Sequence, residues 1–470
     1  MTAHINEFRQ RAKTSIADAR LQGALEGATG HLRQARAESL ADLPDVEALR
    51  DHFKEVRSAT LARLAHHLET FERNALAAGA HVHWAGNAET ACQIVIDIAR
   101  QQGVTMATKS KSMATEEIRL NPALQAAGIQ PVETDLGEWI VQLADEPPSH
   151  IVAPAFHMTR AQVAELFSKE AGKDLPPDDI PLLTSEARAI LRQKFLASDM
   201  GISGGNIAVA ETGSVVLVTN EGNGRMVTSL PKVHVAVVGI EKIAPTWDDA
   251  AVWLSLLGRS STGQHLTAYT TAVTGPARPG DPDGPQEVHI VLLDNRRSHQ
   301  LGTPYEEALQ CIRCGACLNI CPVYREVGGH AYGNPYSGPI GAVIAPLLFG
   351  LEAYEALPHA SSLCVACLEV CPARIDLPRM LLQLRADEVD RRIIPWYERA
   401  AERGLAWAFT HPRLYDRGAN AARFLGRPLF KDGHSAVPRK LNPAQQRRLP
   451  ALAPRSFRQR WASGELEEER

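Results

Sequence analysis

The sequence predicts an α/β domain followed by a smaller, cysteine-rich helical domain. Short apolar segments alternate with amphipathic ones between about residues 75 and 300, which is typical of a sheet that is at least partly parallel. Seven of the eight cysteines follow, between residues 311 and 371. A chain of 470 residues is also long for one hydrophobic core. We therefore expect a helical segment at 1–75, the α/β domain at 76–300, the cysteine domain at 301–385, and a helical region with an Arg- and Pro-rich tail at 386–470.

The first 80 residues are predicted to be helical. Apolar side chains recur at helical spacing between 49 and 76, so most of this stretch should form one amphipathic helix. The sheet should begin with HVHWA at 81–85, and Asn87 then caps a helix that ends at Gly103. Thr159 and Gln162 form a capping box for a later helix. The other predicted strands are VTMAT, IQPVET, HIVAPA, NIAVAE, SVVLVT, VHVAVVG and VHIVLLDN.

Charge and hydropathy exclude several classes of protein. The formal net charge is −4, so no global basic field points to nucleic acid. The N-terminus lacks the apolar segment of a secretory signal, and the longest uncharged apolar run, 338–351, is too short to span a bilayer. These features predict a cytoplasmic protein without a transmembrane segment. In such a protein, clustered cysteines bind metal or act in catalysis rather than form disulfides.

The first cysteine run has the spacing of a bacterial ferredoxin. It follows the pattern C-x2-C-x2-C-x3-C-P and ends at Pro322. Three closely spaced thiolates can bind three irons of one cubane, while the fourth cysteine points toward a second cluster. Because thiolates are soft ligands that suit iron–sulfur clusters, we expect two clusters. The four cysteines of this run are Cys311, Cys314, Cys317 and Cys321.

The second run has one cysteine fewer, because Ser361 stands at the position that matches Cys311. The fourth cysteine of each run is expected to serve the cluster of the other run. This crossover gives one set of four thiolates and one set of three. Cluster one is expected at Cys311, Cys314, Cys317 and Cys371, and cluster two at Cys321, Cys364 and Cys367.

The incomplete set leaves two alternatives for cluster two. The cluster either lacks an iron, as [3Fe–4S], or is [4Fe–4S] with one iron that has no cysteine ligand. In the second case Ser361, Ser362, water or a substrate oxygen could bind that iron. A hydroxyl is a harder ligand than a thiolate, which would make the iron labile. We expect the two clusters to transfer single electrons, with Lewis-acid chemistry at the open iron as the alternative.

Zinc is the competing interpretation of the cysteines. Structural zinc prefers four closed ligands, often two C-x2-C pairs, and seven cysteines in two runs that end in Cys-Pro fit this poorly. The eighth cysteine, Cys92, lies within a predicted apolar helix and should be a buried, inert thiol.

Two stretches of the α/β domain are candidates for an anion site. VTMATKSKSMATEEI runs from a strand into a helix, whose N-terminus favours phosphate or carboxylate. In NEGNGR, two glycines can adopt positive φ and expose backbone N–H groups beside an arginine, as an anion-binding nest does. The candidate residues are Lys109, Lys111, Ser112, Gly222, Gly224 and Arg225.

Simpler roles compete with this site. Gly-rich loops often only turn corners, and lysines on loops are usually solvated. The acidic side chains of ETDLGEW, namely Glu133, Asp135 and Glu138, are expected on a solvated face. The scattered histidines are expected to pack in strands or loops. These are His81, His83, His150 and His157. No catalytic residue stands out.

Together these segments resemble the lactate-utilisation protein B family. The resemblance rests on KSKSMATEEI, NIAVAETGSVVLVTNEGNGRM, CIRCGACLNICPVY, YSGPIGAVIAPLL and SSLCVACLEVCPARIDLP. It covers nearly the whole chain and is weakest in the last 40 residues. That tail is expected to be poorly ordered or to depend on a partner.

The resemblance implies a fold and a role. The α/β part would be a lactate-utilisation domain, similar to sugar-phosphate isomerase and folate-cyclising ligase folds. The cysteine part would resemble the α-helical ferredoxins of succinate dehydrogenase-type subunits. The protein would carry electrons in the oxidation of L-lactate to pyruvate and allow growth on lactate. Its partners would be a cysteine-rich subunit and a second protein with a lactate-utilisation domain. The family's cluster ligands fall on the same seven cysteines, in the same two sets.

Two other functions stand as alternatives. The α/β domain could be a stand-alone enzyme for a phosphorylated or carboxylated metabolite, with regulatory clusters. A nucleic-acid-binding cluster protein has support only from the Arg-rich C-terminal part with Trp396, Trp407 and Trp461, and the near-neutral net charge counts against it. The sequence has no fingerprint of a flavin or nicotinamide site. It therefore does not indicate where the two electrons of a hydride would be split into single electrons.

Overall fold

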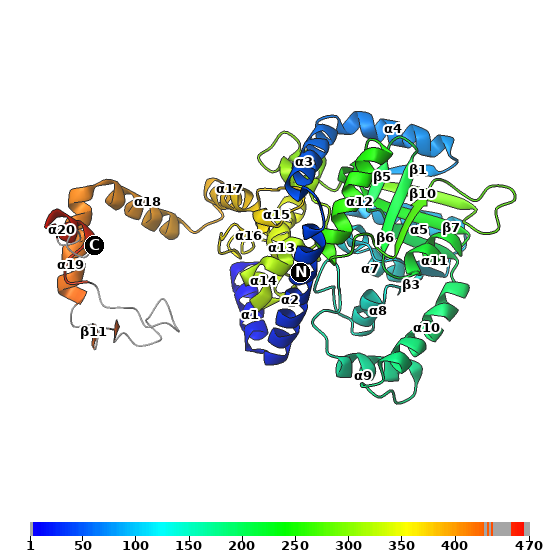
Figure 1. Cartoon of the computed structure of the whole chain (residues 1–470), viewed down its shortest axis with the longest axis horizontal. Helices are drawn as coiled ribbons and strands as arrows, with labels where there is room; N and C mark the ends of the chain where they lie inside the picture. The colour runs from blue at the N-terminus through cyan, green and yellow to red at the C-terminus, as the bar shows by residue number, and fades with distance from the viewer. Residues whose placement is uncertain (1–2, 427–429, 432–433, 436–452, 465–470) are drawn as a thin grey trace. The chain divides into compact units, whose positions relative to one another are not determined.

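The computed structural model describes residues 3–426, 430–431, 434–435 and 453–464. It divides the chain into two compact units, Met1–Glu388 and Val389–Arg470, which are described separately (Figure 1). The boundaries predicted at 75 and 300 fall inside the first unit, and that finer division stays a prediction.

The first unit begins with helices, as predicted. The single helix expected over 49–76 is instead two helices, because the backbone turns at Arg63. The turn lets Leu61 and Leu64 both face the core together with Phe71. The N-terminal helices are α1 (Ile5–Ala17), α2 (Ala19–Ala41), α3 (Val46–Ala62) and α4 (Leu64–Ala77).

A six-stranded sheet forms the centre of the first unit. Its order is β1-β10-β7-β4-β2-β3, and every neighbouring pair is parallel. The sequence predicted five of these strands to within two residues and missed β4, whose sequence MGISG has few strand-forming side chains. The strands are β1 (His81–Ala85), β2 (Met106–Lys109), β3 (Gln130–Glu133), β4 (Met200–Gly204), β7 (Val233–Gly239) and β10 (Glu287–Leu293).

The predicted strand HIVAPA, at 150–155, is wrong. This segment is irregular, because Nδ1 of His150 accepts hydrogen bonds from the backbone N–H groups of Val152 and Ala153. These N–H groups are therefore not available to a sheet, and Pro154 has none to offer.

A second, four-stranded sheet has the order β8-β5-β6-β9. The strands β5 and β6 are antiparallel, and the turn between them contains Gly213 at φ 69°. β8 and β9 were not predicted. The strands are β5 (Ile207–Val209), β6 (Ser214–Thr219), β8 (Ile243–Ala244) and β9 (Tyr269–Val273).

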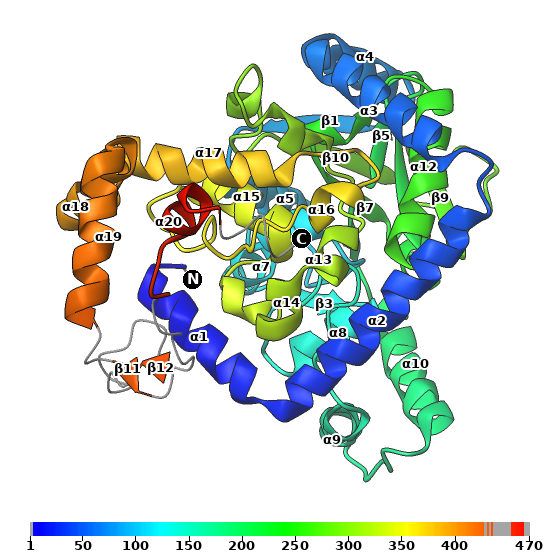
Figure 2. The ribbon, with the colours of Figure 1, turned by 60° about the vertical axis from the view of Figure 1, so that its left-hand side comes forward.

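Helices cover both faces of the large sheet (Figure 2). One face packs on α5 and α7, and the other on α3, α4 and the small sheet. The Asn87 cap of α5 and the Thr159–Gln162 capping box of α9 are confirmed. The remaining helices of this part are α5 (Ala88–Gln101), α6 (Met113–Glu117), α7 (Leu120–Ala126), α8 (Leu136–Leu143), α9 (Arg160–Ala171), α10 (Ile180–Leu196), α11 (Asn223–Ser229), α12 (Trp247–Ser261), η1 (Ile240–Lys242) and η2 (Ser298–Gln300).

The cysteine region is a set of short helices and loops around the buried α15. The N-terminal helices pack on it as well as on the sheet, since α1 and α2 contact α14, and α2 also contacts α13. No helix of the described residues is long and apolar enough to cross a membrane. The helices here are η3 (Glu306–Gln310), α13 (Ala316–Ile320), α14 (Pro322–Val327), η4 (His330–Tyr332), α15 (Gly338–Phe349), α16 (Ala366–Glu369) and α17 (Leu377–Asp390).

The second unit is small in its described part. The helical prediction for this region is confirmed in α18. The expectation for the last 40 residues lies mostly outside the described residues. The elements are α18 (Trp396–Thr410), α19 (Pro412–Gly426), β11 (Phe430–Lys431), β12 (His434–Ser435) and α20 (Phe457–Ala462), with β11 and β12 antiparallel.

Candidate functional site

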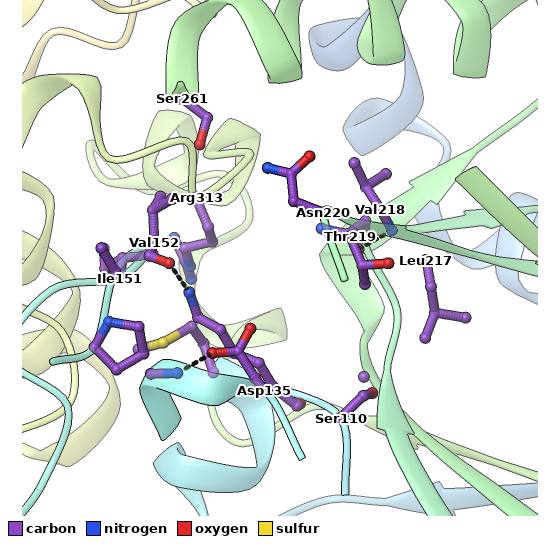
Figure 3. A pocket seen from close by; sticks show the side chains of 18 of the residues that line it. Ser110, Asp135, Ile151, Val152, Leu217, Val218, Thr219, Asn220, Ser261 and Arg313 are labelled. Carbon is purple, nitrogen blue, oxygen red and sulfur yellow. Dashed lines mark hydrogen bonds between the residues drawn. The ribbon is translucent and has the colours of Figure 1, made fainter. Parts of the chain in front are cut away.

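A cavity of about 590 Å³ lies at the carboxyl edge of the parallel sheet. The segments that follow β2, β4, β7 and β10 line it, because parallel strands all end at the same edge. The cysteine region supplies Ile312, Arg313 and Tyr336 to its wall. Arg313 lies on one side of the space and Asn220 on the other (Figure 3). The cavity therefore joins the α/β part to the first cysteine loop.

Charged side chains of both signs line this cavity. The most strongly bound is Arg297, which donates two hydrogen bonds to Glu117, at 2.7 and 2.8 Å, and one to Glu241, at 2.6 Å. Tyr336 donates a further hydrogen bond to Glu117, at 2.5 Å. Burial alone would raise the pKa of Glu241, but Arg297 and Lys242 hold it at about 2. This buried network connects the ends of β7 and β10 to the segment before α15.

Two cations of the cavity are bound less completely. Lys111 donates a hydrogen bond to the carbonyl of Val152 and forms no ion pair within the part of the chain that the structure describes. Burial lowers the pKa of its ammonium group, and the charge of Asp135 opposes that shift. Arg313 lies 3.7 Å from Glu241 and over the ring of Tyr336, but its Nη1 is buried without a hydrogen-bond partner.

Uncharged polar atoms of the cavity also lack partners. The hydroxyl of Ser110 and both amide atoms of Asn223 are buried and form no hydrogen bond. Ser110 is 2% exposed and Asn223 is 3% exposed. Because buried polar groups are nearly always hydrogen-bonded, these atoms indicate a ligand site.

The predicted anion site is only partly formed. Lys111 and Ser112 line the cavity, and Ser112 caps α6. Lys109 does not, because its ammonium group is buried against Glu133, at 2.5 Å, and Asn121, at 2.6 Å. Lys109 is thus neutralised inside the fold rather than available to an anion.

The predicted nest at NEGNGR is wrong. Gly222 has φ −69° and Gly224 lies within α11, so neither adopts the positive φ that a nest requires. Gly224 is needed for packing instead, since a Cβ there would lie 2.8 Å from Cγ2 of Thr219. Arg225 is exposed and does not line the cavity.

The solvated face predicted for ETDLGEW is also wrong. Glu133 is 3% exposed and Glu138 is 2% exposed, because this strand end turns into the protein. Burial, and then the charge of Glu133, raise the pKa of Glu138. Asp135 caps α8 by accepting two backbone hydrogen bonds. Partial desolvation, and then Asp135, raise the pKa of the nearby Glu221 to about 7.

The histidines pack as predicted. His81 and His83 stack on His289, with ring centroids 4.8 and 5.3 Å apart. His157 is hydrogen-bonded to Glu146. His150 is buried, and burial lowers its pKa to about 3. Since its Nδ1 accepts two backbone hydrogen bonds, its Nε2 carries the hydrogen that is donated to Asn319.

Cysteines from both runs meet in a first set. Burial, and then the charges of Cys371 and Cys311, raise the pKa of Cys314 to about 12. Burial and Cys311 likewise raise the pKa of Cys371 to about 11. Cys317 interacts electrostatically with all three of these thiols. Cys371 of the second run therefore lies among the cysteines of the first.

The remaining three cysteines form a second set. Burial, then Cys321 and Cys364, raise the pKa of Cys367 to about 12. Cys317 also interacts with Cys367, so the two sets are neighbours. Cys364 is exposed, whereas in the first set three cysteines are buried and Cys317 is half-buried. These are the two groups that the crossover rule gives, and the assignment of a cluster to each stays a prediction.

The cysteine sets fit iron–sulfur clusters by their donors, which are thiolates alone in two adjacent groups. Cys92 is separate in role. It is buried in α5, its thiol donates to the carbonyl of Ile118, and burial raises its pKa to about 11. The prediction of a buried thiol is thus confirmed.

Sequence reasoning missed the cations around the first set. Each donates to a backbone carbonyl in a cysteine loop or, for Arg57, in η3 just before the first loop. Arg50 binds the carbonyl of Cys371 at 2.8 Å, Lys242 that of Cys311 at 2.8 Å, Arg36 that of Val370 at 2.8 Å and Arg57 that of Leu309 at 3.2 Å. Three of them come from α2 and α3, where the helical pattern gives no sign of a role at a distant loop.

Family comparisons match both parts of the chain. Residues 68–293 match the LUD domain, and residues 307–375 match the 4Fe-4S dicluster domain. The predicted order of an α/β lactate-utilisation domain and a ferredoxin-type domain is therefore confirmed.

Curated relatives match over nearly the full length. The chain is 45% identical over 431 residues to "Lactate utilization protein B" of Bacillus licheniformis, covering 91% of this chain and 90% of the relative. It is 44% identical over 466 residues to the protein of the same name from Bacillus subtilis, covering 98% and 97%. The relative of that name from Macrococcus caseolyticus is 44% identical over 442 residues, covering 93% and 92%.

Proposed function

The chain belongs to the lactate utilization protein B family, and on that premise we propose that it is the iron–sulfur electron-transfer subunit of a system that oxidises L-lactate to pyruvate. The observation that carries this proposal is the pair of adjacent thiolate sets. One is buried beside the cavity and the other reaches the surface at Cys364. Such a pair suits a path for single electrons from the interior to a partner.

The chain's own residues would serve this path in different ways. Cys311, Cys314, Cys317 and Cys371 would hold cluster one, and Cys321, Cys364 and Cys367 cluster two. When bound, iron–sulfur clusters supply reversible one-electron chemistry. Arg50 and Lys242 bind carbonyls next to the first set and would stabilise the negative charge that an electron adds.

We further propose partners of two kinds. The relatives' names place them in lactate utilisation, and an electron carrier needs a donor and an acceptor. A cysteine-rich protein and a second protein with a LUD domain would fill these roles. The exposed Cys364 and its neighbours are the part of the second set that such a protein could reach.

Anaerobic purification of the whole chain tests the clusters first. Iron and inorganic sulfide are counted, and electron paramagnetic resonance of the oxidised and reduced protein identifies each cluster. We expect two clusters that accept electrons. A sample protected from oxygen that contains zinc, or no metal, would contradict the proposal. The second step adds L-lactate and the partner proteins, and we expect the clusters to be reduced only in the complete mixture.

A stand-alone enzyme is the second candidate function, and the cavity at the sheet edge favours it. In that case the purified chain alone would convert L-lactate or another metabolite with an artificial electron acceptor. Turnover without partners would support this candidate over the electron-transfer subunit.

A further inference from the structure

The two cysteine loops have the same local backbone. In the first loop, the residues on either side of Cys314 have positive φ: 61° at Arg313 and 77° at Gly315. In the second loop, the residues on either side of Cys364 match them, with 53° at Leu363 and 70° at Val365. Positive φ is energetically costly for Leu and Val. Its presence at both positions indicates that the second loop is held in the same shape as the first despite this cost.

A hydrogen bond places Ser361 in the role of Cys311. In the first loop, the backbone N–H of Arg313 donates to Sγ of Cys311 at 3.4 Å. In the second loop, the N–H of Leu363 donates to Oγ of Ser361 at 3.1 Å. The serine oxygen thus occupies the position, relative to its loop, that a ligand sulfur occupies in the other.

We propose that Ser361 Oγ is the fourth protein ligand of cluster two, which is then [4Fe–4S] rather than [3Fe–4S]. The Oγ–iron bond forms as the hydroxyl proton is released to solvent, and no electron is exchanged in this step. The proposal rests on the proposed function only in requiring clusters. The neighbouring Ser362 is the weaker candidate, because its side chain is hydrogen-bonded to the thiol of Cys364 and so supports an existing ligand.

Iron counting on anaerobically purified Ser361→Ala, Ser361→Cys and Ser362→Ala tests this ligand. For Ser361→Ala we expect a loss of about one iron per chain and the paramagnetic signal of an oxidised three-iron cluster. Ser361→Cys should keep the iron of the wild type, since it restores a thiolate. Ser362→Ala should also keep it. Thermal unfolding by circular dichroism checks that the variants fold.

Three results would overturn the serine ligand. They are a three-iron cluster already present in the wild type, an unchanged iron content in Ser361→Ala, and an iron loss in Ser362→Ala alone. Each of these still leaves two clusters and the proposed function intact. A wild-type chain without clusters would contradict the proposed function itself.

The cavity carries a second, independent inference. Four cationic side chains line it, Lys111, Lys242, Arg297 and Arg313, against three acidic ones, Asp135, Glu221 and Glu241. Arg297 is fully bound by Glu117 and Glu241, and Lys242 donates to the carbonyl of Cys311. Lys111 and Arg313 are the two cations that still have capacity for an acceptor.

We infer that this cavity binds a small organic carboxylate, with the carboxylate at Lys111 and Arg313. Its volume lies within the range of roughly 300–1,000 Å³ that is usual for ligand pockets. Ser110 and Asn223 offer buried, unpartnered polar atoms to further oxygens of the ligand. A monoanion suits the site better than phosphate, because the carboxylate of Asp135 would repel a second negative charge.

The choice of 2-hydroxy and 2-oxo acids as probes rests on the proposed function. Anaerobic titration calorimetry with L-lactate, pyruvate and inorganic phosphate is carried out on the cluster-containing chain. We expect one of the two acids to bind more tightly than phosphate. Lys111→Gln and Arg313→Gln should each weaken that binding by about 10-fold or more, the usual cost of a lost charge-assisted hydrogen bond. Arg225→Gln is the matched control, since the structure places Arg225 outside the cavity.

The iron content of each variant shows whether Arg313→Gln disturbs the adjacent cluster. Lys111→Gln tests the site independently of the cluster, because Lys111 belongs to the α/β part of the cavity wall. Absence of binding by both acids would overturn the inference. So would tighter binding of phosphate, or unchanged affinity in Lys111→Gln. If any of these results is obtained with a chain whose clusters are present and reducible, the proposed function stands. L-Lactate or pyruvate would then bind a partner protein instead of this cavity.

Discussion

The two thiolate sets differ in their surroundings more than in their loops. The first has four cysteines, three of them buried, and cations bind the carbonyls of its loops. The second has three cysteines, one of them exposed, and its polar neighbours are Ser361, Ser362 and the buried Tyr332. Similar motifs thus lie in different electrostatic environments, one with cations at its loops and the other with neutral hydroxyl groups.

This contrast sets an order for the electrons. Reduction adds negative charge to a cluster, and nearby cations stabilise that charge. We therefore expect cluster one to have the higher reduction potential and to hold the first electron. We expect cluster two to be the one that a partner protein reaches, because Cys364 is exposed.

The largest expected effect comes from Cys371→Ser. Although Cys371 lies in the second run, its thiol belongs to the first set, so the variant should lose or convert cluster one and keep cluster two. Electron paramagnetic resonance and iron counting measure the loss. Cys92→Ser is the control and should keep both clusters. A loss confined to cluster two would show that the crossover is misassigned.

A smaller effect is expected from Arg50→Gln. This change removes a charge that donates to the carbonyl of Cys371 at 2.8 Å, so the reduction potential of cluster one should fall while that of cluster two stays constant. Redox titration followed by paramagnetic resonance measures both potentials in one sample. Arg379→Gln, a partly exposed arginine paired with Glu307, is the control. Equal shifts of both clusters, or none, would remove the electrostatic contrast.

The smallest effect concerns pH. His150 packs against Gly315 of the first loop, and its pKa is about 3 in the folded protein compared with 6.5 for an ordinary histidine. The unfolded chain therefore binds one more proton between these values, and stability falls as the pH drops from about 6.5 toward 3. One proton contributes about 1.4 kcal/mol per pH unit.

Urea unfolding of the cluster-containing chain between pH 5 and 7 measures this slope. His150→Gln should reduce the slope by one proton, because glutamine does not titrate and can still donate to Asn319. An identical slope in the variant would show that His150 does not control the acid sensitivity of this loop.

The cysteine sets could be predicted because their information is local. Spacing within each run specifies the loop, and the crossover follows from geometry common to two-cluster ferredoxins. The strands β7 and β10 were predicted for the same kind of reason, since each is a continuous run of buried apolar residues.

The rest of the site depends on long-range contacts. Nothing in the sequence around Arg50 indicates that it reaches the carbonyl of Cys371, and Lys109 and Lys111 look alike although one is buried against Glu133 and the other faces the cavity. The prediction of a turn at Gly224 was wrong because the sequence does not distinguish two reasons for a glycine. One is a backbone with positive φ, and the other is a neighbouring side chain that leaves no room for a Cβ, as Thr219 does here.

The contact between Arg50 and Cys371 joins positions 321 residues apart. During translation, Arg50 therefore leaves the ribosome long before Cys371 is synthesised. The same holds for Arg36, which lies 334 positions before Val370. Arg36 and Arg50 can make these contacts only after synthesis has passed residue 371, whereas Lys242 can reach the carbonyl of Cys311 earlier. A cluster inserted into this set before then would lack the charges of Arg36 and Arg50, so we expect cluster one to be inserted after both cysteine runs have been synthesised.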